Sequence, residues 1–493
     1  MATIVVSYEN EDYSKQIEYI FKLFFSVYGV DWRMIPYAKL FTFKPDAKDV
    51  VITYGKNRPR GRLHHQIHIY ESHLFGQDYL KASSMPNTPL KRFDGIPIIY
   101  QGNNQVEGHV KHTEGLIETD IDIIASSFFM LTRYEEVVAP VQDKFERYPA
   151  TASLAYREGF LERPIVNEYI ELLWDWIDSF GLGFQRKNLW EGKDFAVCLT
   201  HDVDRIRKFR IIPPLLTLRC ALFKKKNFKN ALTIFEDYVK TNLRMKSDPY
   251  QVAFERVIDL EKRQGVRSSF YFMAHGEDYS IRNPFIVDLI TRLKNENFEI
   301  GLHGSFDSYN NPTILKQEKE RIQEVVENSV IGSRQHYLRW KTPDTWRALE
   351  KAGFIYDTTL GFADQVGFRS GICYPYKPFD IIENKEIDIW EVPLIVMDGS
   401  LFGYQNLSLE EGLKKIKKLI DVVAQYRGIF VTLWHNSSFY ELENPGVFQI
   451  YRQMLEYITN KNALCSSVQD VLKIWCKAVK LCNSTNSVLQ ERK

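Results

Sequence analysis

The sequence predicts an α/β protein in which a smaller α/β domain precedes a larger set of parallel strands joined by crossover helices. Three observations support this prediction. After residue 190, apolar β-like runs alternate with helical patterns, as is typical of βαβ units. Ionisable side chains follow the ends of several of these runs. Residues 1–150 instead mix short β-like runs with loops. The alternation fits either a (β/α) barrel or an open doubly wound sheet.

The smaller domain is expected over residues 1–150. Its β-like runs are TIVVSY, DVVITYG, QIHIYES and IPIIYQG, and the segment DIDIIASSFFMLTRYEEV that follows has the apolar spacing of a buried helix. A helical linker is expected over residues 151–190, because RPIVNEYIELLWDWIDSFG is amphipathic and ends at Gly181.

The larger part is expected over residues 191–480. Its β-like runs are FAVCLTH, RSSFYFMA, FEIGLHG, HYLRW, FIYDTTLG, DIWEVPLIVMDG and GIFVTLWHNSS, and two of the helical patterns between them are PFIVDLITRLKNEN and PDTWRALEKAG. In parallel α/β folds the catalytic groups gather at the carboxyl ends of strands. We therefore expect five residues that are distant in sequence to converge: Asp202, Asp204, His303, Arg339 and His435.

A basic helical insertion is expected at about residues 205–260. It contains nine Lys or Arg and no Asp or Glu from Arg205 through Phe235. The simpler interpretation is a solvated helical excursion. The alternative is that the insertion attracts an anionic surface or a lipid-phosphate carrier of the substrate.

Composition excludes several partners. The 64 Lys plus Arg balance 63 Asp plus Glu, so no overall field favours nucleic acid.

The sequence starts without a basic segment followed by an apolar one, and no apolar run reaches the roughly 18 residues of a membrane span. We therefore expect a cytoplasmic protein without a transmembrane segment. The six cysteines include no C-x-x-C pair, so neither a disulfide framework nor a zinc knuckle is predicted.

The segment LTHDVDR suggests a metal site. Side chains two positions apart on a strand point the same way, so Asp202 and Asp204 face one pocket. His303 stands at the end of the apolar run EIGLH. Neutral imidazole together with carboxylates is typical of zinc, cobalt or manganese sites.

Two further strand ends carry candidate catalytic groups. In GSRQHYLRW, alternation would place Arg334, His336 and Leu338 on one face and Tyr337 and Arg339 on the other. Arg339 can orient a carboxylate or hold substrate through its fixed set of donors. His435 ends the apolar run IFVTLWH, and histidine can donate a proton near neutral pH.

Together, the segments LTHDVD, YFMA, IGLH, LRW followed by Pro343, and LWH resemble the polysaccharide deacetylase family over about residues 190–475. Members of that family are metal-dependent carbohydrate esterases with a distorted (β/α) barrel. The resemblance implies that Asp202 is the catalytic base, Asp204 and His303 are metal ligands, Arg339 tethers the base, and His435 is the general acid.

Segments outside these motifs resemble a bacterial subgroup of the same family that has an extra N-terminal domain. They include DIIASSFFMLTRYEE, FLERPIVNEY and YDTTLGFADQVGFR. Proteins of this subgroup are commonly linked with surface-polysaccharide production.

The chain departs from the family pattern at one ligand. The pattern H-[ST]-x-x-H places both histidines on the metal, but the residue four positions after His303 is Asp307. His336 is the favoured third ligand because it shares a strand end with Arg339; Asp307 or water is the alternative. The residue that orients His435 is expected to be Asp357 or Asp364.

The function that follows from the resemblance is removal of N-acetyl groups from an amino-sugar glycan or its precursor. The cofactor is expected to be Zn²⁺, with Co²⁺ or Mn²⁺ as alternatives. Two other functions compete with this one. A barrel that has lost a ligand would bind glycan without catalysis, and a manganese-dependent glycosyltransferase would use Asp202 and Asp204 to hold a nucleotide sugar.

Overall fold

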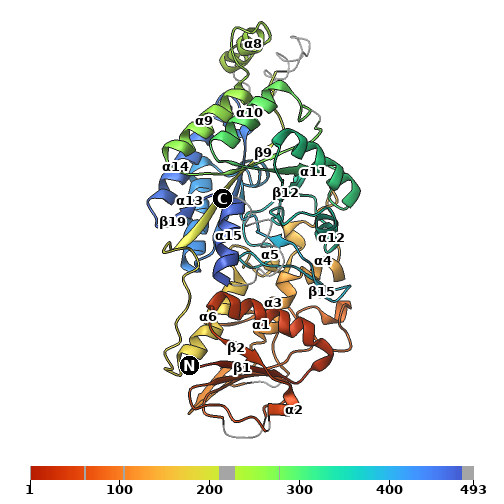
Figure 1. Cartoon of the computed structure of the whole chain (residues 1–493), viewed down its shortest axis with the longest axis vertical. Coiled ribbons are helices and arrows are strands. Elements are labelled where there is room, and N and C mark those ends of the chain that lie inside the picture. The colour runs from red at the N-terminus through yellow and green to blue at the C-terminus, as the bar shows by residue number, and fades with distance from the viewer. Residues whose placement is uncertain are drawn as a thin grey trace.

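The structure is a computed structural model that describes residues 2–40, 42–59, 63–103, 106–209, 228–276 and 278–479. Its two large sheets contain six and nine strands. The six-stranded sheet, built from the N-terminal part of the chain, lies at the bottom of Figure 1, and the nine-stranded sheet lies above it. None of the described helices is long and apolar enough to cross a membrane.

The six-stranded sheet has the order β2-β1-β3-β4-β8-β7 and is parallel except for β7, which pairs antiparallel with β8. Its strands are β1 (Ile4–Tyr8), β2 (Trp32–Met34), β3 (Val50–Gly55), β4 (Gln66–Tyr70), β7 (Val110–Thr113) and β8 (Leu116–Thr119). A small hairpin, β5 (Lys91–Phe93) with β6 (Ile96–Ile98), lies beside it.

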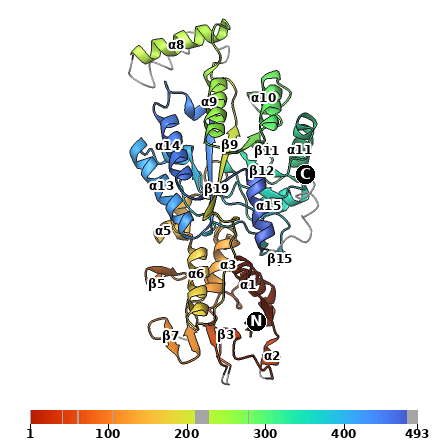
Figure 2. The same cartoon turned by 60° about the vertical axis from the view of Figure 1, so that its left-hand side comes forward.

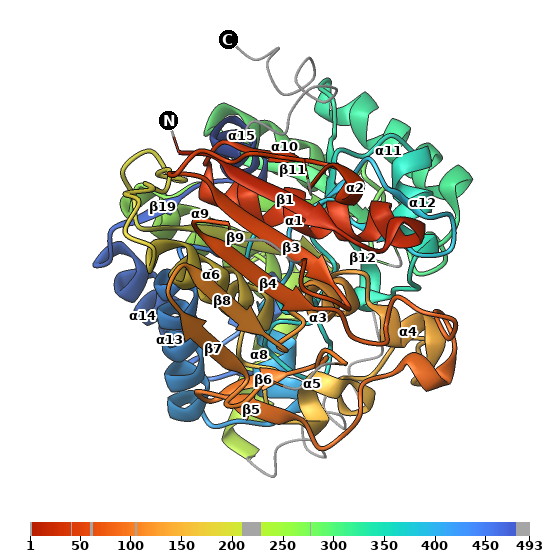
Figure 3. The same ribbon diagram turned by 90° about the horizontal axis from the view of Figure 1, so that it is seen from below.

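Three helices separate this sheet from the rest of the molecule: α1 (Ser14–Tyr28), α3 (Ile123–Leu131) and α6 (Ile165–Asp178). They lie above the sheet in Figure 1 and behind it in Figure 3. The buried stripe of α1 includes Ile17, Ile20 and Phe24, which pack into the main apolar core. Two shorter helices are α2 (Tyr37–Leu40) and α5 (Leu154–Arg157).

The helix expected in DIDIIASSFFMLTRYEEV forms, but it is interrupted. Arg133 has φ +52°, a left-handed conformation that ends α3 and separates it from α4 (Tyr134–Val138). The side chain of Asp122 caps α3 by accepting from the backbone N–H of Ala125 at 2.9 Å. The domain boundaries at residues 150 and 190 stay predictions.

The nine-stranded sheet is parallel and curled into a half-barrel. Its strands follow the order β16-β13-β12-β11-β10-β9-β18-β17, and β19 pairs with the start of β9. They are β9 (Phe195–Val203), β10 (Ser269–Phe272), β11 (Glu299–Gly304), β12 (Gly332–Gln335), β13 (Tyr356–Asp357), β16 (Trp390–Glu391), β17 (Val396–Met397), β18 (Ile429–His435) and β19 (Ala463–Cys465). This arrangement confirms the expected parallel strands.

The two ends of the curled sheet are joined by residues 392–395. The expected single strand DIWEVPLIVMDG is therefore two short strands, because Pro393 has no N–H to donate to a ladder. Val392 donates to the carbonyl of Asp357 at 2.9 Å, and Ile395 donates to the carbonyl of Val431 at 3.1 Å. The segment thus bridges opposite edges of the half-barrel. A further hairpin pairs β14 (Phe379–Asp380) with β15 (Lys385–Glu386).

Helices surround the half-barrel, and local caps start several of them. Asp248, Asn283 and Asn311 each cap a helix that begins with proline. The helices are α9 (Pro249–Arg263), α10 (Pro284–Asn295), α11 (Pro312–Val326), α12 (Asp344–Lys351), α13 (Leu409–Gln425), α14 (Val447–Thr459) and α15 (Val468–Val479).

The insertion includes α8 (Phe228–Asn242), which projects beyond the half-barrel in Figures 1 and 2. A small apolar cluster that includes Phe209, Tyr238 and Tyr440 links α8 to the rest of the molecule. Most of the basic run, residues 210–227, lies outside the described residues. The hypothesis of an anionic surface or carrier therefore stays a prediction.

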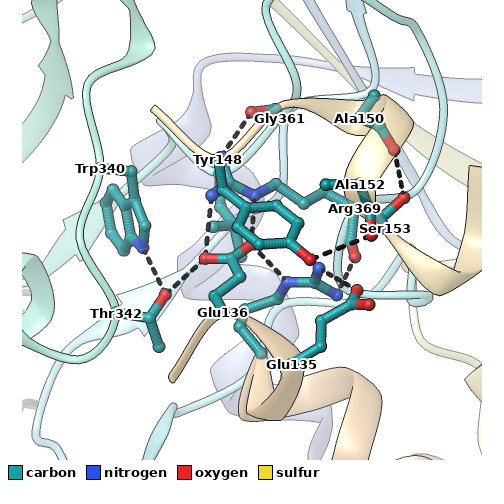
Figure 4. Close-up of polar contacts among 12 residues, drawn as sticks. Glu135, Glu136, Tyr148, Ala150, Ala152, Ser153, Trp340, Thr342, Gly361 and Arg369 are labelled. Atoms are coloured by element: carbon teal, nitrogen blue, oxygen red, sulfur yellow. Dashed lines mark hydrogen bonds and ion pairs between the residues drawn. The ribbon is translucent and has the colours of Figure 1, made fainter. Parts of the chain in front are cut away.

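A buried ion network ties α4 to loops of the half-barrel (Figure 4). Arg133 and Arg369 both donate to Glu136, and Thr342 donates to the same carboxylate at 2.7 Å. Burial alone would raise the pKa of Glu136, but the two guanidinium groups outweigh it and lower the pKa to about 2. The segment that follows α4 is therefore anchored at its start against the half-barrel.

Candidate metal and catalytic centre

A pocket of about 740 Å³ opens at the carboxyl ends of the central strands. Asp202 is on β9, His303 is on β11 and His435 ends β18. Asp204 follows β9, and His336 follows β12. All five line the pocket. Of the residues that were expected to converge, only Arg339 does not line it, and His336 lines it in addition.

The ring of His303 is oriented for a ligand role. Its Nδ1 lies 3.0 Å from the carbonyl oxygen of Arg334, and a carbonyl only accepts, so Nδ1 carries the proton. This tautomer leaves a lone pair on Nε2, which lies 3.0 Å from Oδ1 of Asp204. Burial works to lower the pKa of His303, but the nearby carboxylates of Asp202 and Asp204 outweigh it and raise the pKa.

His336 completes a group of three possible metal ligands. Its Nε2 lies 3.8 Å from Oδ1 of Asp204, and the ligand atoms of Asp204, His303 and His336 all lie within 4.8 Å of one another. Tetrahedral ligands about 2.0–2.2 Å from zinc stand about 3.3–3.6 Å apart, a range that lies between the two measured distances. Burial lowers the pKa of His336 to about 3, which keeps the imidazole neutral.

This donor set fits a divalent metal. With the proton of His303 on Nδ1, the buried Oδ1 of Asp204 has no hydrogen-bond donor among the described residues, which is costly for a carboxylate unless a cation satisfies it. The alternative ligand, Asp307, has a side chain that is 83% exposed and lies 3.6 Å from Arg339. The geometry therefore favours His336 over Asp307 as the third ligand.

The prediction of a strand at HYLRW is wrong. β12 ends at Gln335, and the next residues form a tight turn in which Tyr337 and Leu338 have φ values of +60° and +54°. Two successive non-glycine residues in the left-handed region are uncommon and store strain. The turn ends the alternation of faces and changes the direction of Arg339.

Arg339 is not brought to Asp202. Its guanidinium donates to the carboxylate of Glu146 and to the carbonyl oxygens of Phe145 and Phe306. The role expected for Arg339, tethering the base, is thus not favoured by its contacts. The arginine nearer the strand of Asp202 is Arg334, which donates to the hydroxyl of Thr200 at 2.9 Å.

Asp202 is almost completely buried, and its Oδ1 has no hydrogen-bond donor among the described residues. Its Oδ2 lies 3.8 Å from Nδ1 of His303. Thr200 shares the same face of β9, and the bond from Arg334 to Thr200 places a buried cation beneath the site. The free lone pairs of Asp202 leave it able to accept a proton.

His435 is oriented by Asp398, which follows β17. Oδ1 of Asp398 lies 2.7 Å from Nδ1 of His435, and Oδ2 accepts from the backbone N–H of His435 at 2.8 Å. Burial works to lower the pKa of His435, but Asp398 and the carboxylates of the pocket raise it to about 10. Nε2 of His435 lies 3.6 Å from Oδ2 of Asp204.

The two residues expected to orient His435 have other partners. Asp357 accepts from the hydroxyl of Ser333 and the N–H of Thr359, and Asp364 accepts from the N–H of Ala150. The expectation is corrected to Asp398. Its sequence signal was the apolar run LIVM ending in Asp-Gly, the same pattern of a polar strand end that indicated His435.

Fold and site together define a curled (β/α) half-barrel protein with a candidate divalent-metal centre at its strand ends. Residues 5–181 match the model of a family of unknown function, DUF7033. That match includes nearly all of the region expected to be the smaller domain and most of the expected linker. None of the curated proteins matches the sequence.

Solved structures similar to the chain include polysaccharide deacetylases. A Mycobacterium smegmatis protein assigned as a polysaccharide deacetylase has 17% identity and a TM-score of 0.40, with 59% of this chain and 93% of that chain covered. A family 4 carbohydrate esterase from Bacillus anthracis has 14% identity and a TM-score of 0.28, covering 57% and 83%. A CE4 family pseudoenzyme from Bacillus anthracis has 10% identity and a TM-score of 0.27, covering 57% and 66%.

Proposed function

We propose that the protein is a metal-dependent hydrolase that removes N-acetyl groups from an amino-sugar-containing glycan or glycan precursor. The observation that carries this proposal is the grouping of three ligand atoms from Asp204, His303 and His336 in one pocket. Asp202 lies beside His303, and His435 lies beside Asp204. Hydrolysis of an amide needs a proton acceptor and a proton donor around an activated carbonyl, and this arrangement can supply both.

Asp204, His303 and His336 would hold the metal, for which Zn²⁺ is proposed. A divalent ion bound there supplies Lewis-acid activation of an amide carbonyl and lowers the pKa of water. Asp202 has free lone pairs in the pocket and is positioned to accept the proton of the attacking water. His435, held through Nδ1 by Asp398, presents its other nitrogen to the pocket and is positioned to protonate the departing amine.

The contacts favour this function over both alternatives. The degenerate barrel was suggested by the missing second histidine of the family pattern, and His336 is positioned to supply that ligand from the turn after β12. A glycosyltransferase that used Asp202 and Asp204 for a nucleotide sugar would have no use for the pair of Asp398 and His435. The link with surface-polysaccharide production is proposed from the sequence resemblance alone.

The experiment is acetate release from N-acetylated chito-oligosaccharides, with protein reconstituted separately with zinc, cobalt and manganese. Asp202→Asn is expected to abolish turnover while retaining about one metal ion per chain, because Asn cannot act as the proton acceptor. Two outcomes contradict the proposal: an Asp202→Asn protein as active as the parent, or a reconstituted parent that releases no acetate from any N-acetylated saccharide tested.

A further inference from the structure

Four aromatic side chains line the pocket. Phe145, Phe306, Tyr337 and Tyr404 all line it, and they are called the aromatic rim here. Phe306, Tyr337 and Tyr404 are 39%, 45% and 50% exposed. A large aromatic side chain exposed at a cavity mouth loses the stabilisation of burial, and a group of them marks a surface that contacts a ligand or partner.

The rim is assembled from distant parts of the chain. Phe145 precedes the half-barrel, in the segment after α4, and it stacks on Tyr337 with ring centroids 5.1 Å apart and planes at 22°. Phe306 meets Tyr337 edge-on, with centroids 5.7 Å apart. These are favourable aromatic geometries, so Phe145, Tyr337 and Phe306 pack together as one aromatic group.

Arg147 links two of the rim's side chains. Its side chain is almost completely buried, and it donates to the carbonyl of Tyr337 at 2.9 Å and to the hydroxyl of Tyr404 at 3.2 Å. Its charge is paired with Asp143, through bonds of 2.9 and 2.7 Å to one oxygen. Arg147 is therefore a positioning residue for the aromatic rings.

The segment of Phe145 and Arg147 is anchored on both sides. Glu146, between them, accepts from Arg339 and from the hydroxyl of Tyr309. The network of Figure 4 fixes α4 before the segment, and the N–H of Ala150 donates to Asp364 after it. The wall that the segment adds to the pocket is therefore preformed, which lowers the entropy cost of binding.

We propose that the aromatic rim is a binding subsite for a second sugar ring of the glycan, so that the substrate is an oligosaccharide and the segment before the half-barrel helps to select it. The apolar C–H faces of a pyranose ring pack on aromatic faces. The two arginines that contact the rim, Arg147 and Arg339, are already paired with Asp143 and Glu146, so neither guanidinium is left without a carboxylate partner. The pocket volume of about 740 Å³ lies high in the usual range of about 300–1,000 Å³ and leaves room for more than one ring.

The identity of the ligand as a glycan rests on the proposed function. The test measures binding separately from acetate release, so a failure of the subsite can be told apart from a failure of the proposed function. Isothermal titration calorimetry compares tetra-N-acetylchitotetraose with N-acetylglucosamine on the full chain. The parent is expected to bind the tetramer more tightly than the monomer by about three- to tenfold per stacked ring. Phe306→Leu and Tyr404→Leu are expected to lose that difference while keeping the affinity for the monomer.

The matched control is Tyr156→Leu, because Tyr156 is also an exposed aromatic, at 43%, but does not line the pocket. It is expected to bind the tetramer as the parent does. The subsite is overturned if the parent binds the tetramer no more tightly than the monomer, or if both rim variants keep the parent's affinity for the tetramer. If the rim variants lose tetramer binding but the parent releases no acetate, the subsite stands and the proposed function fails.

Discussion

Oδ1 of Asp398 lies 2.7 Å from Nδ1 of His435, although the two residues are 37 positions apart in sequence. Asp398 follows β17 and His435 ends β18, and these strands are neighbours in the half-barrel. The carboxylate also accepts from the backbone N–H of His435. The bond to Nδ1 fixes the direction of the imidazole, and the backbone bond holds the carboxylate in place, as a general acid requires.

The first prediction concerns this pair. Asp398→Asn is expected to lower kcat for acetate release by about 10²-fold or more, because general acid catalysis contributes about 10²–10⁴-fold and the variant loses the charge that holds His435 protonated. Asp364→Asn is the matched control, since Asp364 contacts the backbone of Ala150 instead. Equal losses in the two variants would contradict the assignment of Asp398.

The second prediction concerns the third metal ligand. His336→Ala is expected to lose the bound divalent metal, as are Asp204→Ala and His303→Ala, because the three side chains form the ligand group. Asp307→Ala is expected to keep it, since that carboxylate faces solvent. Elemental analysis of the purified proteins measures this directly. Metal lost from Asp307→Ala but kept by His336→Ala would reverse the assignment.

Sequence patterns predicted the parts of the site that follow regular strands. Asp202, His303 and His435 end apolar runs, and parallel strands bring such ends together whatever their distance in sequence. The patterns failed after Gln335, because the left-handed Tyr337 and Leu338 end the strand alternation on which the direction of Arg339 depended.

The partner of His435 was harder to predict for a different reason. The sequence does not show which strands are neighbours, and the choice among acidic strand ends depends on that order. The structure pairs β17 with β18, which places Asp398 beside His435. The parallel strands of the half-barrel were predictable from their alternation with helices. The break between β16 and β17 was not predicted, because a single proline causes it within an otherwise apolar run.

The third prediction concerns the buried network of Figure 4. Glu136→Ala is expected to lower the free energy of unfolding by about 3–5 kcal/mol, because it leaves the buried guanidinium groups of Arg133 and Arg369 without their shared carboxylate. Glu324→Ala is the control, since its pair with Arg282 is exposed, and its effect should stay within about 0.5 kcal/mol. Urea denaturation measures both. Similar losses would show that the network contributes no more than a surface pair.

The fourth prediction concerns pH. Burial raises the pKa of Glu71 from 4.5 to about 7. The hydrogen bond that Asn10 donates to Glu71 works to lower this pKa, and the carboxylate of Asp122 raises it further. Because the folded-state pKa is the higher one, this contribution to stability is fully present below about pH 4.5 and is lost as pH rises through about 7. Glu71→Gln is expected to reduce the loss of stability between pH 6 and 8.

Urea denaturation of the parent and of Glu71→Gln at both pH values tests this expectation. Titration of other groups affects both proteins alike, so the comparison isolates Glu71. An equal fall in unfolding free energy for the two proteins between pH 6 and 8 would show that Glu71 titrates at its ordinary value.

The position of His336 also affects the segment after β11. When a strand carries one ligand and the following loop must carry another, that loop is tied to the metal and its side chains have little freedom to vary. If His336 supplies the third ligand from the turn after β12, as we propose, residues 305–307 need not supply one. Phe306 can then face the pocket mouth, and Asp307 can face solvent. Under that proposal, the loop after β11 can vary and reshape the pocket without changing a metal ligand.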